Sequence, residues 1–223
     1  MLLERLSING NPNIGVLAFV NNKLALVPPG ITRSVRRALE EVLGVDVIET
    51  TIADTRIVGV FVSGNDRAVL LPHIVSPEEL DALESAVGRS LRIAVIPSRK
   101  TALGNLIVAN NKAAVVSSEL EPGAVKSIEE ALGVKVCVRR YSITPAIGSL
   151  TVANDSASLV HPGLSDEEIA DIERCLGVRA GPATVNEGVA FVKSGVLLNN
   201  RGVLVGELTT GPEIMNIQSL LAD

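Results

Sequence analysis

The chain has 223 residues, of which 47% are hydrophobic and 20% charged, and its mean hydropathy is +0.37, which excludes a disordered chain. Because no apolar stretch approaches the roughly 20 residues that cross a bilayer, and no apolar leader opens the sequence, we expect a soluble, cytoplasmic protein without membrane contact. The 20 basic and 25 acidic side chains give a net charge of −5, which argues against DNA or general phosphate binding.

The first predicted element is a strand over residues 2–8, and five copies of one unit follow it. Each copy is marked by an Asx doublet, and the doublets are spaced at 44, 45, 44 and 45 residues: Asn21-Asn22, Asn65-Asp66, Asn110-Asn111, Asn154-Asp155 and Asn199-Asn200. Asn and Asp tolerate the left-handed backbone of tight turns, so each copy is predicted to open with a β-hairpin. An Asx-rich calcium site is disfavoured, since calcium loops gather several ligands within one loop.

A glycine stands six residues before the doublet in four of the copies, at Gly15, Gly59, Gly104 and Gly148. The fifth copy departs from this pattern. It carries Lys193 at the equivalent position, and Gly195 follows two residues later.

A helix and a second strand are predicted after each hairpin. The helix starts are in register at Thr32, Ser76, Glu121, Ser165 and Thr210, and Glu79, Glu168 and Glu213 complete capping boxes in three of them. The expected helix ends are Gly44, Gly88, Gly133 and Gly177. The second strands are predicted over 45–52, 91–98, 134–143 and 178–185.

The fifth copy ends in a helix over 212–221 and leaves no residues for a closing strand. We therefore expect the strand 2–8 to complete the fifth copy, which closes an α/β ring without open edges. A linear solenoid would need distinct capping repeats, and none is visible. The prediction is a single domain over 1–223, with repeats at 9–52, 53–98, 99–143, 144–185 and 186–223.

Residues suited to catalysis are scarce. His73 and His161 occupy loop positions where other copies have proline, and Cys175 falls in a column of small core residues. Cys137 is expected on the less apolar face of its strand, without a partner base. No phosphate-binding glycine loop follows a strand. We therefore expect no catalytic, cofactor or metal site, and a protein that is not an enzyme.

Three segments carry a specific likeness: 100–118 (KTALGNLIVANNKAAVVSS), the AND turn at 153–155, and 185–217, which contains VGELTTGPE. Together they resemble the archaeal translation initiation factor 6 family, over the whole chain. The resemblance implies a pentein fold and a monomeric factor that binds the large (50S) ribosomal subunit, keeps the small (30S) subunit from joining it, and takes part in large-subunit biogenesis.

The same resemblance implies contact with ribosomal proteins near the sarcin–ricin loop, with at most minor contact to rRNA. The family's Gly-Asn contact pair matches Gly104 and Asn105, whereas an arginine that eukaryotic members place in the second copy is Val60 here. Two alternatives stay open: a guanidine-modifying enzyme, which in the pentein fold uses a Cys, a His and acidic residues around the axis, and a homo-oligomeric scaffold.

Charge is distributed unevenly along the chain. Residues 145–223 carry four basic side chains against ten acidic ones, whereas residues 1–144 carry 16 against 15. The acidic last third is a solubilising surface or a surface for a basic protein partner, since complementary charge orients encounter.

Overall fold

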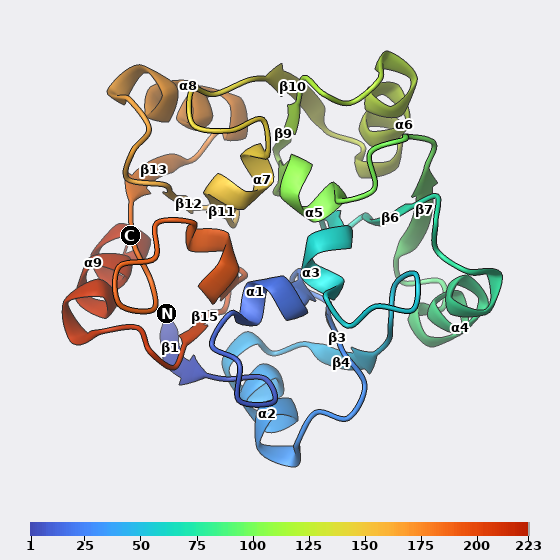
Figure 1. Ribbon diagram of the computed structural model, residues 1–223, viewed down its shortest axis with the longest axis horizontal. Coiled ribbons are helices and arrows are strands. Elements are labelled where there is room, and N and C mark those ends of the chain that lie inside the picture. The colour runs from blue at the N-terminus through green and yellow to red at the C-terminus, as the bar shows by residue number, and fades with distance from the viewer. Residues whose placement is uncertain (223) are drawn as a thin grey trace.

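The computed structural model describes residues 1–222, which form five three-stranded sheets around a central axis (Figure 1). The inner strand of each sheet faces the axis; these strands are β2 (Phe19–Val20), β5 (Ser63–Gly64), β8 (Ile107–Ala109), β11 (Thr151–Ala153) and β14 (Val196–Leu198). Each pairs antiparallel with a middle strand: β3 (Leu24–Val27), β6 (Ala68–Pro72), β9 (Ala113–Ser117), β12 (Ala157–Val160) or β15 (Gly202–Gly206). These pairs are the predicted hairpins, with the Asx doublets at their turns.

A third strand pairs parallel with each middle strand. Four of these follow their sheet's helix in the chain: β4 (Asp46–Glu49), β7 (Arg92–Ile96), β10 (Lys135–Arg139) and β13 (Arg179–Pro182). The fifth is β1 (Leu2–Leu6) from the start of the chain, which pairs with β15 from Leu2 opposite Gly202 to Leu6 opposite Gly206. The predicted closure of the ring by the N-terminal strand is therefore confirmed.

Long helices surround the sheets at the periphery (Figure 1). They are α2 (Arg33–Ala38), which continues as the π-helical turn η1 (Leu39–Leu43), then α4 (Pro77–Val87), α6 (Pro122–Leu132), α8 (Asp166–Leu176) and α9 (Gly211–Leu221). All five begin after the predicted cap residues, and the three predicted capping boxes are present. No helix within residues 1–222 is both long and apolar enough to span a membrane.

The core lies between the sheets, not inside any one repeat. Each of the five hydrophobic clusters combines a long helix with side chains from two adjacent sheets. The cluster around Leu39, for example, joins Val27 of β3 to Leu204 of β15, which are far apart in sequence. Every repeat thus completes its neighbour's core, and the junction between the last and first repeats is built like the other four.

A closed ring of hydrogen bonds also joins the repeats. The first Asn of each doublet donates through Nδ2 to the main-chain oxygen of the first Asn in the next doublet. The five donor–acceptor distances, in the order Asn21, Asn65, Asn110, Asn154 and Asn199, are 2.9, 3.3, 3.1, 3.1 and 3.2 Å. The last bond, from Asn199 to Asn21, closes the circle. All five side chains are buried, so the turn doublets bind the repeats together as well as turning the chain.

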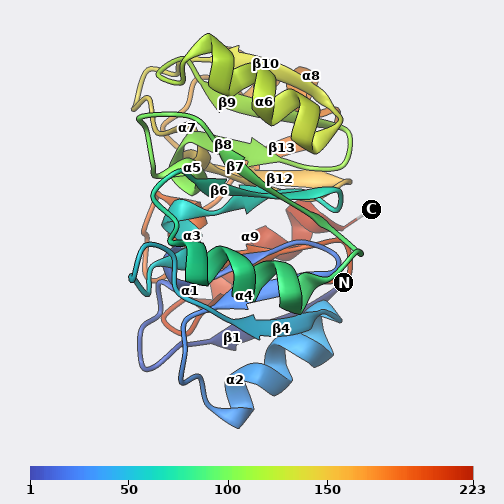
Figure 2. The ribbon, with the colours of Figure 1, turned by 90° about the vertical axis from the view of Figure 1, so that its right-hand side faces the viewer.

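Helical turns that the sequence did not predict precede the hairpins: α1 (Ile14–Leu17), α3 (Val58–Phe61), α5 (Leu103–Leu106), α7 (Ile147–Leu150) and the 3-10 turn η2 (Val192–Gly195). They surround the axis on one face, and the side view places them together at the end opposite the chain termini (Figures 1 and 2). We call this the short-helix face. The strands β4, β7, β10 and β13, predicted to follow the helices, are also shorter than predicted, because their last predicted residues leave the parallel pairing and form loops.

Candidate functional site

Backbone packing explains the glycine column of the short-helix face. An added Cβ would lie 2.1 Å from the Gly15 oxygen at Gly59, 2.1 Å from the Gly59 oxygen at Gly104, and 2.5 Å from the Gly104 oxygen at Gly148. Each short helix therefore rests directly on the main chain of the preceding one, which only glycine allows. Gly104 is buried in this contact, so its role in the molecule is close packing.

Asn105 follows Gly104 on α5, and its side chain is half-buried on the short-helix face. Its main-chain N–H donates to the Ala102 oxygen at 3.0 Å, which is part of the helical turn. No hydrogen bond within residues 1–222 uses its side-chain amide, in contrast to the five Asn residues of the doublet ring. The Asn105 amide is therefore free to bind another molecule.

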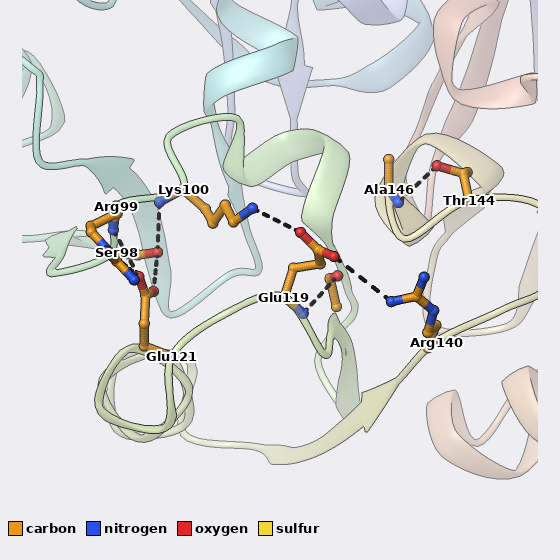
Figure 3. Close-up of polar contacts among 9 residues, drawn as sticks. Ser98, Arg99, Lys100, Glu119, Glu121, Arg140, Thr144 and Ala146 are labelled. Carbon is orange, nitrogen blue, oxygen red and sulfur yellow. Dashed lines mark hydrogen bonds and ion pairs between the residues drawn. The ribbon is translucent and has the colours of Figure 1, made fainter.

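A network of polar contacts fixes the loop that leads into α5 (Figure 3). The Lys100 ammonium lies 2.7 Å from Glu119, and the same carboxylate lies 3.8 Å from Arg140. The Ser98 hydroxyl donates to Glu121 at 2.6 Å, and this bond, with main-chain N–H groups, lowers the pKa of the Glu121 carboxyl to about 2. Exposed ion pairs contribute little each, but together they connect the loop that leads into α5 to the loops that carry Glu119 and Arg140.

The axis opens on the short-helix face as a depression of about 290 Å³. Each repeat contributes to the wall of this depression the residue that follows the glycine-column position: Val16, Val60, Asn105, Ser149 and Ser194. Gly15, Phe191 and Lys193 complete the wall. Asn105 and Val60 therefore occupy equivalent positions in the ring. Below the depression, a cavity of about 60 Å³ runs along the axis between the inner strands, and Lys193 lines both spaces.

The histidines and cysteines are not among the residues that line the axial depression. His161 is in the loop after β12, where its ring contacts Phe191 edge to face at 5.1 Å between centroids, and His73 is exposed in the equivalent loop of the second repeat. Cys175 is in the core as predicted. Cys137, expected on the less apolar face of its strand, is only 8% exposed because α8 covers it there, whereas its neighbour Val138 is 43% exposed.

The Cys175 thiol is not suited to nucleophilic attack. Burial and the adjacent thiol of Cys137 raise the pKa of Cys175 to about 12, which keeps that thiol protonated near neutral pH. Within residues 1–222, no three His, Cys, Asp or Glu side chains are grouped closely enough to hold a metal ion.

Comparison with known proteins assigns the chain to a family. The model of the eIF-6 family matches residues 3–220. The chain belongs to the eIF-6 family. It is 50% identical over 221 residues to translation initiation factor 6 of Hyperthermus butylicus, an alignment that covers 99% of this chain and 98% of that protein. It is 44% identical over 219 residues to the factor of Staphylothermus marinus, covering 98% and 96%.

Solved structures with little sequence similarity share the fold of this eIF-6 member. DDAH from Pseudomonas aeruginosa superposes with a TM-score of 0.53 at 16% identity, covering 82% of this chain and 73% of that one. The amidinotransferase SxtG of Microseira wollei gives 0.52 at 10% identity, covering 77% and 64%. The predicted pentein fold is confirmed, and at these identities the likeness extends to the fold alone.

Proposed function

We propose that this eIF-6 family member binds the large ribosomal subunit and that its bulk keeps the small subunit from joining. The mechanism needs no chemistry, because a ring that occupies the joining surface excludes the other subunit sterically. By the same binding, the protein takes part in maturation of the large subunit. It acts in the cytoplasm, as a monomer and not as an enzyme.

The observation that carries this proposal is the free amide of Asn105 on the short-helix face. A side chain held on a rigid helical turn, with its donor and acceptor unused, is preorganised to bind a partner. Phe191, 43% exposed on the same face, adds the kind of aromatic surface that is enriched at protein interfaces. Gly104 supports this contact indirectly, since it lets α5 pack close enough to hold Asn105 in place.

Charge favours ribosomal proteins over rRNA as the main partners. Residues 145–223 carry four basic against ten acidic side chains, and an acidic surface repels phosphate while it attracts a basic protein. The partners are accordingly ribosomal proteins near the sarcin–ricin loop, with only minor contact to rRNA. This electrostatic share of the binding should weaken as ionic strength rises.

Gradient sedimentation of purified subunits tests the proposal. The wild-type protein should migrate with the large subunit and deplete joined ribosomes, and Asn105→Ala should do both less well while unfolding like the wild type. Gln218→Ala is the matched control, because it removes an exposed amide from the outer helix α9. Migration of the wild-type protein with neither subunit would refute the function, and unchanged binding of Asn105→Ala would refute the contact.

A further inference from the structure

Lys193 breaks the fivefold pattern at the centre of the ring. Four repeats place glycine at this position, and in each of them the main chain of the preceding repeat fills the space of a side chain. The fifth repeat has a 3-10 turn instead of an α-helical turn, and its Gly195 packs against the side chains of Val185 and Asn186, not against the main chain of the preceding repeat. This change of geometry makes room for one long cationic side chain on the axis.

The ammonium of Lys193 forms no ion pair with any carboxylate in the part of the chain that the structure describes, residues 1–222. Loss of solvent alone lowers the pKa of the Lys193 amine to about 8, and no neighbouring negative charge offsets this effect. The Lys193 side chain is half-buried and its ammonium has no counter-ion, so an external anion would stabilise the charged form.

The walls around Lys193 have the composition of a small binding site. On the polar side lie the unused amide of Asn105 and the hydroxyls of Ser149 and Ser194, whereas Val16 and Val60 form an apolar side. The two serine hydroxyls donate to main-chain oxygens, at 2.6 and 2.8 Å, so the Lys193 ammonium and the Asn105 amide are the side-chain donors that remain for an anion. The depression is open to the short-helix face, so a group from outside can enter it.

We propose that this axial depression takes one carboxylate group of a partner protein, bound between the Lys193 ammonium and the Asn105 amide. The acidic side chain would place its aliphatic stem against Val16 and Val60. The inference rests on the proposed function, because it supplies the chemistry of one contact on the face that would bind the large subunit.

A carboxylate fits these walls better than a phosphate. Lys193 is the one cation among the residues that line the depression, so the site offers a single positive charge to an anion. One ammonium and one amide match a monoanion, whereas phosphate sites usually gather several cations or a bidentate arginine. The valines on the other side suit a methylene stem and leave the remaining phosphate oxygens without donors.

An NMR titration of the isolated full-length protein tests the site without ribosomes. The pKa of the Lys193 amine is measured from its side-chain resonances, assigned by comparison with Lys193→Met, in sodium acetate and in sodium chloride of equal ionic strength. Bound acetate stabilises the ammonium, so the pKa should be higher in acetate. An equal pKa in both salts would overturn the inference, and so would a rise in sodium phosphate without one in acetate.

Binding to large subunits tests the role of the site in the complex. Lys193→Met keeps the length of the stem and removes the charge, and should weaken binding about tenfold or more, as expected for a lost hydrogen bond to a charged group. Lys126→Met is the matched control, because Lys126 is exposed on the outer helix α6. If the wild type binds and Lys193→Met binds equally well, the inference fails while the proposed function stands. If the wild type does not bind large subunits, the proposed function fails, and the pKa of Lys193 measured in acetate and in chloride still decides whether the anion site exists.

Discussion

The Asn ring predicts a large and graded loss of stability when its members are truncated. The Asn110 side chain makes four hydrogen bonds: Nδ2 donates to the oxygens of Asn154 and Leu176, and Oδ1 accepts from the N–H groups of Lys112 and Ala113. Asn110→Ala removes all four at a site that is 5% exposed. At about 1 kcal/mol net for each bond, the free energy of unfolding should fall by about 4 kcal/mol.

Asn21 provides an internal comparison. Its Nδ2 donates only to the Asn65 oxygen, while Oδ1 accepts from Lys23 and Leu24, so it makes three hydrogen bonds instead of four. The bond that Asn21 lacks corresponds to the one from Asn110 Nδ2 to the Leu176 oxygen, at the end of helix α8. Asn21→Ala should therefore cost about 3 kcal/mol, roughly 1 kcal/mol less than Asn110→Ala.

Equilibrium unfolding in guanidinium chloride measures both values, with the slope of the transition as a check that the denatured states are alike. Ser156→Ala is the control, since Ser156 is an exposed turn residue two positions after Asn154 and only its main chain bonds to that Asn. It should unfold like the wild type. The reasoning would be refuted if Asn110→Ala were as stable as Ser156→Ala, or if Asn21→Ala were the less stable of the two Asn variants.

Three further predictions concern packing and pH. Gly104→Ala places a Cβ against main-chain oxygens at 2.1 and 2.6 Å and should cost more than about 2 kcal/mol, whereas Gly123→Ala on α6 meets open space and should be neutral or stabilising in thermal unfolding. Burial alone would raise the pKa of Glu79, but hydrogen bonds from the Thr51 hydroxyl and from main-chain N–H groups outweigh it and lower the pKa. The ionised carboxylate therefore contributes to the free energy of unfolding above pH of about 4, and this contribution is lost as pH falls through the lowered pKa. Glu79→Gln should show a smaller loss of stability in acid than the wild type. Because its pKa is lowered to about 8, the Lys193 amine of the folded protein loses its proton above that pH, whereas the amine of the unfolded chain keeps it to about pH 10. Between about pH 8 and 10 the free energy of unfolding of the wild type should therefore rise relative to that of Lys193→Met. A difference between the two proteins that did not change with pH would contradict the loss of solvent around this amine.

Repeated local signals explain why much of the fold was predictable. The Asx doublets, the cap residues and the helix-ending glycines each report a backbone conformation that a few neighbouring residues determine. Gly44, Gly133 and Gly177, for example, have the left-handed φ values of 63, 61 and 66° that end their helices. Because these signals recur at 44 or 45 residues, they also gave the number of units and the missing fifth strand.

The candidate site was only partly predictable. Asn105 was expected as a contact from the family motif, and the exception at Lys193 was visible as a break in the glycine column. The sequence gives no sign that Lys193 and Asn105 line one depression, because the two residues belong to different repeats and share it only in the closed ring. The depression is likewise built from residues of all five repeats, so no single repeat contains it.

The sequence by itself determined five repeats, their turns and helix ends, and a ring closed by the first strand, since each follows from local backbone preferences repeated at a fixed interval. Only the tertiary structure decided that apolar residues such as Ile14–Leu17 form a helical turn, that Cys137 is buried, and that the doublet asparagines bond from repeat to repeat. Packing between repeats makes these choices: a short apolar run fits helix or strand equally well, and its neighbour across the interface selects one.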